Sequence, residues 1–252
     1  MLDEKFDQLI NEALSQPFSG WDFSHIHDRW QNDNPPWDYK AIVEEHLSQV
    51  DSLLDMGTGG GEFLAGLKPL PKRTHATEAW QPNIPVAKKR LEPLGITVHG
   101  IKEKETLPFD DDTFDLIINR HEWFDVKDVY RILKPDGLFI TQQVGGKNDS
   151  RLNELISGKL PEFIDFGLEN NQRELEEANF EILRAEEAFP DLRFFDVGAI
   201  VYYLKVVEWQ IPDFDVEHYR EQLLAIHEMI ERDGELWVEQ HRFLLVGRKT
   251  QA

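Results

Sequence analysis

A run of glycines near residue 60 is a place where chemistry could be done. Gly57, Gly59, Gly60 and Gly61 follow the apolar stretch SLLDM, and an acid, Glu78, comes about twenty residues later. Glycine has no Cβ, so such a turn costs chain entropy and is kept where a ligand must approach the main chain. A carboxylate at that distance can accept hydrogen bonds from two hydroxyls, as it does for the ribose of a dinucleotide. The spacing predicts a small-ligand site that uses both contacts.

Two phosphate-binding motifs resemble this turn, and neither is complete. A P-loop requires Gly-Lys-Ser/Thr after four spacer residues, but Gly66 is followed by Leu67 and Lys68. A dinucleotide fingerprint, Gly-x-Gly-x-x-Gly, would have Glu62 at its last position. That carboxylate would stand at the start of the following helix, where the pyrophosphate of a dinucleotide lies. The turn therefore favours a ligand without phosphate.

A second group of reactive side chains follows the apolar stretch FDLIINR at residues 114–120. His121 comes directly after it, and an unperturbed imidazole titrates near neutrality, so His121 is a candidate general base. The alternative is a histidine that caps a strand end and bonds to the next helix. Gln142 and Gln143 could contact the same substrate, or could simply end a later strand with hydrogen bonds.

Alternating strand-like and helix-like patterns would position these residues. Strands are predicted over 52–56, 75–80, 96–101, 114–120, 137–144, 180–189 and 235–249, and helices over 2–13, 39–47, 62–67, 85–95, 126–137, 174–180, 196–209 and 216–232. Apolar strands that alternate with helices imply a mostly parallel sheet covered on both faces. Ligands of such sheets bind beyond the carboxyl ends of the strands, where the glycine turn is expected.

Residues 55–61, Asp-Met-Gly-Thr-Gly-Gly-Gly, resemble the first motif of the class I S-adenosylmethionine-dependent methyltransferases, Asp/Glu-x-Gly-x-Gly-x-Gly, of the type 11-like kind. The resemblance continues with Glu78 at the end of the second predicted strand, with LPFDDDTFDLIINR and with YRILKPDGLFITQQV. These motifs stand in the family's order and spacing and cover residues 50–145.

The resemblance implies an α/β, Rossmann-like fold with a seven-stranded, mostly parallel sheet, helices on both faces and an antiparallel last strand. Residues 50–252 would form the methyltransferase domain, with a substrate-side insertion at 145–170. Residues 1–49 would form a helical extension, whose aromatic residues could close over the cofactor as a lid or seal the sheet edge. The implied cofactor is S-adenosyl-L-methionine.

The resemblance also assigns residues to this cofactor. Main-chain groups of the turn would reach the methionine portion, Glu78 the ribose hydroxyls and Trp80 the adenine face. An acid after the third strand would contact the adenine amino group, and Glu103 and Glu105 are both candidates. The implied cofactor residues are Asp55, Gly57, Thr58, Gly59, Gly61, Glu78, Trp80, Glu103 and Asn119.

The acceptor should border the end of the fourth strand, at residues 119–123, with His121 as the catalytic residue. Asn-Arg-His-Glu stands there in place of the Asn/Asp-Pro-Pro-Tyr/Phe motif common to methyltransferases of exocyclic and amide nitrogens, which argues against that chemistry. A look-alike, Asn34-Pro35-Pro36-Trp37, lies too close to the glycine turn for a permuted enzyme and is interpreted as a rigid turn. Residues 193–195, Arg-Phe-Phe, could line the same cleft.

Composition narrows the partners. The 252 residues include 48 acidic and 27 basic ones, a net charge of -21 that makes binding to phosphate backbones unfavourable. There is no cysteine, which excludes thiolate nucleophiles, and no metal site is predicted because His25, His27 and Asp28 lack a supporting cluster. No apolar run reaches membrane-spanning length, so a cytoplasmic protein is expected.

The sequence thus predicts methyl transfer from S-adenosylmethionine to a small-molecule acceptor. Two alternatives stay open: an RNA methyltransferase that uses a local basic patch, and a non-catalytic protein that senses the cofactor. The sequence names neither the acceptor, nor the atom that is methylated, nor the oligomeric state.

Overall fold

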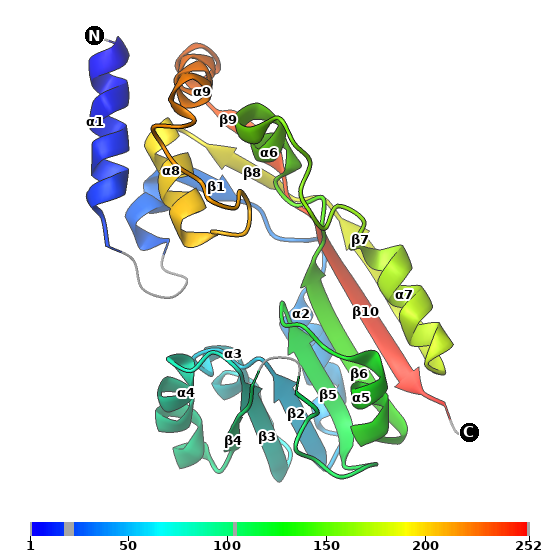
Figure 1. Cartoon of the computed structure of the whole chain (residues 1–252). Helices are drawn as coiled ribbons and strands as arrows, with labels where there is room; N and C mark the ends of the chain where they lie inside the picture. Colours follow the sequence, from blue (N-terminus) through cyan, green and yellow to red (C-terminus); the bar gives the residue numbers. More distant parts are fainter. Residues whose placement is uncertain (1, 18–22, 103–104, 251–252) are drawn as a thin grey trace. The chain divides into compact units, whose positions relative to one another are not determined.

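The structure, a computed structural model, describes residues 2–17, 23–102 and 105–250. The chain forms two compact units whose segments interleave along the sequence (Figure 1). Unit 1 consists of residues 1–35, 145–166 and 188–241, and unit 2 of residues 36–144, 167–187 and 242–252.

Unit 2 is built on a seven-stranded sheet with the order β4-β3-β2-β5-β6-β10-β7. Neighbouring pairs from β4 to β6 run parallel, and β10 runs antiparallel to β6. This confirms the predicted mixed sheet with an antiparallel last strand. The strands are β2 (Ser52–Met56), β3 (Arg73–Glu78), β4 (Thr97–Gly100), β5 (Phe114–Arg120), β6 (Leu133–Val144), β7 (Phe180–Ala188) and β10 (Arg242–Lys249).

Helices cover this sheet, and short polar residues begin two of them. Asp38 accepts a hydrogen bond from the main chain of Ala41 at the start of α2, and Asp125 accepts two at the start of α5. Apolar side chains of α5 and α7 pack on the sheet face that carries Leu54 and Ile117. The helices of unit 2 are α2 (Tyr39–Leu47), α3 (Glu62–Ala65), α4 (Asn83–Leu91), the 3-10 helix η2 (Glu92–Leu94), α5 (Val126–Ile132) and α7 (Leu168–Glu177).

Unit 1 has its own core, between helices and a three-stranded antiparallel sheet of order β1-β8-β9. Helix α8 is almost wholly buried and packs against α1 and α9. Its Lys205 ammonium donates to the carbonyls of Ala13, Leu14 and Gln16 at the end of α1, at 2.8, 3.0 and 3.0 Å. The elements of unit 1 are α1 (Leu2–Ser15), the 3-10 helix η1 (Ser24–Arg29), β1 (Trp30–Asn32), α6 (Ser150–Ser157), β8 (Asp191–Phe194), α8 (Val197–Val206), α9 (Arg220–Asp233) and β9 (Leu236–Glu239).

The single strand predicted over 235–249 is wrong. Two strands occupy this stretch, β9 in the small sheet and β10 in the large one. Between them Gln240 donates its main-chain N–H to the carbonyl of Pro190, and the buried His241 stacks on Phe189 at 4.8 Å. No glycine or proline marks this break in the sequence. The strands β1 and β8 and the helix α6 were also not predicted.

The units divide the chain at other places than the predicted domains. Residues 36–49, expected in the N-terminal extension, belong to unit 2, while residues 145–166 and 188–241 belong to unit 1 together with α1. The lid function of the N-terminal segment stays a prediction. None of the described helices is long and apolar enough to cross a membrane.

The ion pair between Arg29 and Asp196 provides a test of how unit 1 is held together. The two guanidinium–carboxylate hydrogen bonds measure 2.7 and 2.6 Å, and Asp196 also accepts from the main chain of Ala199, which caps α8. Replacing Asp196→Ala removes the cap and leaves a largely buried guanidinium without this partner. We expect the free energy of unfolding to fall by about 2–3 kcal/mol, measured by urea denaturation with circular dichroism. Asp196→Asn keeps a capping oxygen and should cost about half as much. Equal stability of Asp196→Ala and the natural protein would contradict this role.

Candidate active site

The glycine turn follows β2 and has the backbone that only glycine adopts without strain. Gly57, Gly59 and Gly61 have φ angles of 65, 61 and 82°, all in the left-handed region. The turn is fixed by two main-chain hydrogen bonds, from Thr58 to Thr77 at 2.9 Å and from Gly61 to Thr58 at 3.0 Å. A Cβ on Gly59 would meet no atom within 4 Å. This side of the turn is therefore open, and the close approach of a ligand there stays a prediction.

Glu78, at the end of β3, holds the turn in place. Its Oε2 accepts a hydrogen bond from the main chain of Gly59 at 2.7 Å, and its Oε1 accepts one from the main chain of Trp80 at 2.8 Å. The residue is buried, with 4% of its surface exposed. A carboxylate has about four acceptor positions, so both oxygens can still accept a hydroxyl from a ligand. Glu78 thus shapes the turn before any ligand binds.

Asp55, the last acid before the turn, is buried at the end of β2. Burial raises the pKa of Asp55 to about 7, with opposing contributions from Thr58 and Arg120 and a reinforcing one from Glu78. Because folding raises this pKa above its unfolded value, the stabilising contribution of Asp55 is full below about pH 4 and is lost as the pH rises through about 7. Asp55 is therefore poised to ionise when a cation approaches.

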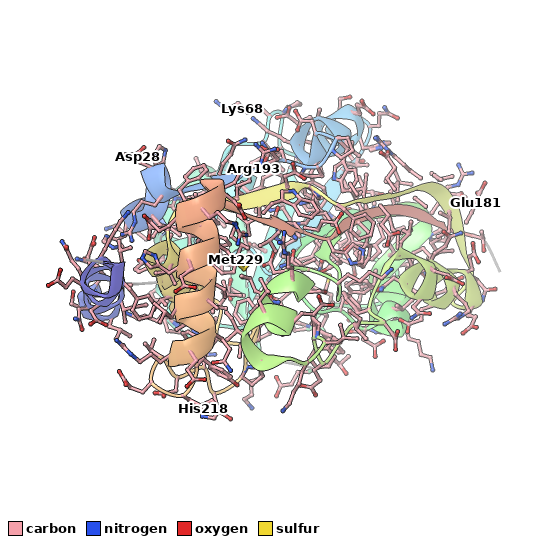
Figure 2. All side chains as sticks on the ribbon, turned by 90° about the horizontal axis from the view of Figure 1, so that it is seen from above. Asp28, Lys68, Glu181, Arg193, His218 and Met229 are labelled. Carbon is pink, nitrogen blue, oxygen red and sulfur yellow. The ribbon has the colours of Figure 1, made fainter. Side chains whose placement is uncertain are left out.

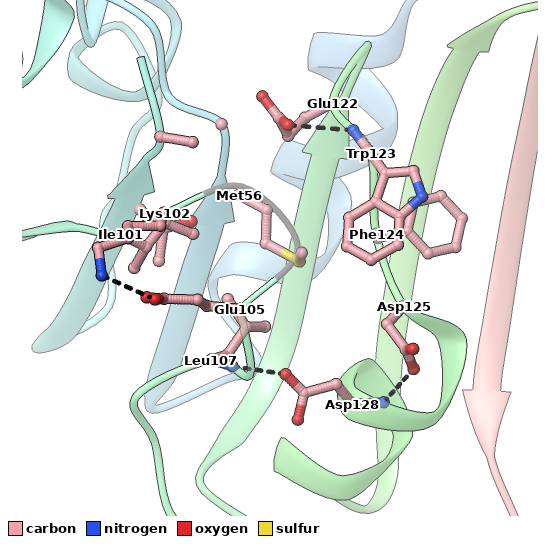
Figure 3. A pocket seen from close by; sticks show the side chains of 13 residues that line it. Met56, Ile101, Lys102, Glu105, Leu107, Glu122, Trp123, Phe124, Asp125 and Asp128 are labelled. Carbon is pink, nitrogen blue, oxygen red and sulfur yellow. Dashed lines mark hydrogen bonds and ion pairs between the residues drawn. The ribbon is translucent and has the colours of Figure 1, made fainter. Parts of the chain in front are cut away.

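A hollow that is partly open to solvent lies next to the turn at the carboxyl ends of β2 and β3 (Figure 3). Its apolar wall suits a flat ring, since Met56, Ile101, Leu107 and Phe124 all line it. Charged side chains, four acidic ones and Lys102, also line it, so the hollow combines apolar and charged surfaces. It is lined by Met56, Gly57, Thr77, Ala79, Ile101, Lys102, Glu105, Leu107, Glu122, Trp123, Phe124, Asp125 and Asp128.

The residues predicted to contact adenine lie in different surroundings. Trp80 is half exposed beside the turn. Glu105 lines the hollow and pairs with the Lys102 ammonium at 3.2 Å (Figure 3). Glu103 lies outside the described residues. The sequence did not indicate Met56, Leu107 or Phe124, because apolar residues in such stretches are equally typical of core.

A buried polar cluster ends β5 and β6, next to the glycine turn. Asn119, directly opposite Met56 in the sheet, is fully buried, and its Oδ1 accepts from Gln143 Nε2 at 2.6 Å and from Thr141 Oγ1 at 3.2 Å. Among the described residues its Nδ2 has no hydrogen-bond partner. A buried donor without a partner costs free energy, and a bound ligand or water can supply the missing acceptor.

His121 stands one residue beyond β5 in a strained conformation. Its φ is 64°, and its main-chain N–H donates to the carbonyl of Gln142 at 2.9 Å. Its ring Nε2 lies 3.1 Å from the side-chain Nε2 of Gln142. Desolvation, and then the charges of Arg242 and Arg120, lower the pKa of His121 although the residue keeps exposed surface. A non-glycine residue held at positive φ stores backbone strain, which makes function a hypothesis at this position. Asp112, Asp136 and Asn179 share this conformation.

The segment Asn34-Pro35-Pro36-Trp37 has a role that its interpretation as a turn did not include. Trp37 Nε1 donates to Gln142 Oε1 at 2.7 Å, and the Tyr39 hydroxyl donates to the carbonyl of Asn119 at 2.9 Å. Both aromatic residues are buried, and burial raises the pKa of Tyr39. Trp37, just before α2, and Tyr39, its first residue, therefore hydrogen-bond to the polar cluster.

Other predicted residues belong to unit 1 and are engaged there. Arg193, labelled in Figure 2, pairs with Asp191 at 2.9 Å, and Phe194 is in the core of unit 1. His27 pairs with Asp28, which lies on the outer surface (Figure 2). In the described part of the chain no group of three or more possible ligands could hold a metal ion.

A family model described as a methyltransferase domain matches residues 54–141. These residues form a methyltransferase domain. It is of the class I S-adenosylmethionine-dependent type, as the four motifs predicted. The matched segment runs from β2 to β6, so it contains the glycine turn, Glu78, Asn119 and His121 of the candidate site.

Curated relatives of the methyltransferase domain cover only part of the chain. The chain is 29% identical over 152 residues to the malonyl-[acyl-carrier protein] O-methyltransferase of Marinomonas sp. (strain MWYL1). This aligned region covers 54% of this chain and 52% of the relative. The chain is also 29% identical over 114 residues to the uncharacterized methyltransferase YcgJ of Bacillus subtilis (strain 168), covering 42% and 45%. The chain spans about half the length of these relatives.

Solved structures agree on the fold. YcgJ of Bacillus subtilis superposes with a TM-score of 0.56 at 17% identity, over 85% of this chain and 99% of that one. The [4+2]-cyclase SpnF superposes with a TM-score of 0.53 at 17% identity, over 98% and 93%. At such identities the similarity shows the fold alone, and the fold of the methyltransferase domain also serves a cyclase.

Removing the Glu78 carboxylate should loosen the glycine turn of the methyltransferase domain. In Glu78→Ala the main-chain N–H groups of Gly59 and Trp80 lose their acceptor. We expect the free energy of unfolding to fall by about 1.5–3 kcal/mol, the usual contribution of hydrogen bonds to a charged group, and both amides to exchange faster with deuterium. Glu105→Gln, a change at an exposed acid that does not contact the turn, should leave both amides unchanged. Unaltered exchange at Gly59 in Glu78→Ala would show that the turn is held by other contacts.

Proposed function

We propose that the chain transfers a methyl group from S-adenosylmethionine to a small-molecule acceptor. The observation that carries the proposal is the hydrogen bond between an open Gly59 and a buried Glu78. Gly57, Thr77 and Ala79, close to these two residues in the chain, line the hollow. A ligand that binds there meets main-chain groups, a carboxylate and an apolar wall in turn. This order suits an amino acid linked to a ribose and an adenine.

The residues present fit each part of S-adenosylmethionine. The Glu78 oxygens have acceptor capacity for the ribose diol, and the apolar residues of the hollow suit the adenine ring. The buried Asn119 Nδ2 lacks a partner among described residues and can donate to the carboxylate of the amino-acid end. Asp55 and Glu122 supply negative charge for the ammonium and the sulfonium.

Methyl transfer from a sulfonium needs little chemical activation by the protein. S-adenosylmethionine supplies a methyl group on a sulfonium, which is already a good leaving group. The protein therefore binds both reactants, orients the acceptor in line with the methyl group and excludes water. We expect the acceptor to approach at the end of β5, where His121 directly precedes Glu122, a residue that lines the hollow.

The net charge of -21 supports a small acceptor over a nucleic acid. One relative is named for methylating the malonyl group of an acyl-carrier protein, so carboxylic acids belong in any acceptor panel. Labelled methyl transfer from S-adenosylmethionine to fractions of metabolites and of RNA tests the proposal. Transfer to RNA alone would favour an RNA methyltransferase, and binding without any transfer would favour a sensor of the cofactor.

Two glycines of equal backbone strain provide a matched test of the cofactor site. Gly59 and Gly95 have φ angles of 61 and 80°, and a Cβ on either meets no atom within 4 Å. Gly59→Val should abolish binding of S-adenosylhomocysteine in calorimetry because the side chain fills the ligand's space. Gly95→Val, in the turn before β4, should destabilise the fold to a similar degree and keep the affinity, which we expect in the range of about 1 μM to 1 mM. Equal affinities of the two variants would place the cofactor elsewhere.

The raised pKa of Asp55 predicts how cofactor affinity depends on pH. A bound sulfonium and ammonium favour the ionised carboxylate, so binding below about pH 7 must release a proton. We expect S-adenosylmethionine to bind more tightly as the pH rises from about 5 to 7, by at most about tenfold per pH unit, and then to level off. Asp55→Asn should bind with little pH dependence, and S-adenosylhomocysteine, which lacks the sulfonium charge, should show a shallower dependence. Calorimetry across this range would refute the assignment if the affinity of the natural protein were flat.

A further inference from the structure

A chain of hydrogen bonds leads from the buried Trp37 to His121. Trp37 Nε1 lies 2.7 Å from Gln142 Oε1, and Gln142 Nε2 lies 3.1 Å from His121 Nε2. An indole N–H can only donate, so the Gln142 atom that faces it must be the oxygen. The amide nitrogen must then face His121. The orientation of Gln142 follows from chemistry and not from an arbitrary choice between its oxygen and nitrogen.

The same logic fixes the proton of His121. An amide nitrogen only donates, so His121 Nε2 must accept and carry no proton. A neutral imidazole then holds its proton on Nδ1, and a second proton on Nε2 would oppose the Gln142 donor. None of the described residues makes a hydrogen bond with Nδ1. His121 therefore has no free lone pair for a general base, and presents an N–H donor from a residue with exposed surface.

The surroundings of His121 favour negative charge on whatever accepts this donor. The charges of Arg120 and Arg242 both disfavour the imidazolium, which places positive potential at the ring. The main chain also fixes the position of the His121 ring, since a hydrogen bond from the His121 N–H to the carbonyl of Gln142 accompanies its φ of 64°. Gln142 thus holds both the backbone and the ring of His121.

We propose that Trp37 and Gln142 are positioning residues that hold His121 as an Nδ1–H donor to an anionic oxygen of the methyl acceptor, which is a carboxylate. This proposal names the acceptor class of the proposed function and rests on it. The carboxylate oxygen supplies the electron pair for the new O–CH₃ bond, the S–CH₃ bond breaks with its pair left on sulfur, and no proton moves. A methyl ester and S-adenosylhomocysteine result, and the reaction needs no general base.

Nitrogen NMR of the ligand-free protein tests the hydrogen-bond chain apart from any activity. Two-bond ¹H–¹⁵N spectra distinguish the two neutral forms of histidine, and the loss of signals in His121→Asn assigns those of His121. We expect the Nδ1–H form. Gln142→Glu keeps an oxygen toward Trp37 and turns a second oxygen toward His121, so it should shift the proton to Nε2 and raise the pKa of His121. Gln81→Glu, which adds a carboxylate at an exposed site of unit 2, should change neither. An Nε2–H form in the natural protein would overturn the proposal. If Gln142→Glu fails to fold, Trp37→Phe should also weaken the preference for Nδ1–H, and an unchanged preference would count against the chain.

Two substitutions of equal shape separate a donor from a base. Asparagine and aspartate both tolerate positive φ, but only asparagine offers an N–H near the place of Nδ1. With labelled S-adenosylmethionine and a panel of carboxylic acids that includes malonate, His121→Asn should keep transfer within about tenfold, while a base would cost about 10²–10⁴-fold. His121→Asp should lower transfer by about 10²-fold, because it removes a hydrogen bond to the charged acceptor and places a second negative charge beside it, which weakens acceptor binding.

The product identifies the acceptor atom. Label in a methyl ester is released as methanol by alkali, and label on nitrogen, carbon or an ether oxygen is not. Release of most of the label supports a carboxylate acceptor, and alkali-stable label overturns it. Absence of both transfer and S-adenosylhomocysteine binding would count against the proposed function, while the NMR result would still decide the state of His121.

Discussion

The hydrogen bonds that the Glu78 carboxylate accepts are the interaction on which the rest of the site depends. The glycine turn has a single side chain, the buried Thr58, so its shape depends mainly on main-chain bonds and on this one buried acid. Glu78 reaches the turn because β3 lies beside β2 in parallel register, with Asp55 opposite Ala76. The glycine turn also forms part of the wall of the hollow, which Gly57 lines. The Glu78 carboxylate thereby links the pairing of β2 and β3 to the shape of the candidate binding site.

Burying polar groups at the ends of β5 and β6 costs free energy, and hydrogen bonds from Trp37 and Tyr39 offset this cost. Buried amides need partners, and Trp37 and Tyr39 supply donors from residues far away in the sequence. In this cluster Asn119 Nδ2 is a buried donor without a hydrogen-bond partner among the described residues. Stability and function share the same network here, because the residues that satisfy buried groups also orient the reactive ones.

Local sequence patterns predicted most strands and helices and the glycine turn, whereas contacts between residues far apart in the sequence could not be predicted. The strands 52–56 and 114–120 and the helix 39–47 were predicted to the residue, because uninterrupted apolar runs and helical spacing are local. The partners of Trp37 and Tyr39 lie about a hundred residues away, so no local pattern reveals them. The tautomer of His121 depends on those partners as well. The break at residues 240–241 was missed for a similar reason, since it is made by pairing with two different sheets and not by a turn residue.

The position of β10 between β6 and β7 has a consequence for how the protein is made. Residues 242–249 leave the ribosome after every other strand of the large sheet, yet they fill an interior place in it. Until then β7 has no neighbour in this sheet and β6 has an unpaired edge, which is an aggregation risk for a nascent chain. The large sheet is therefore complete only after β10 has been synthesised, and chaperone binding during translation would protect the unpaired edges of β6 and β7.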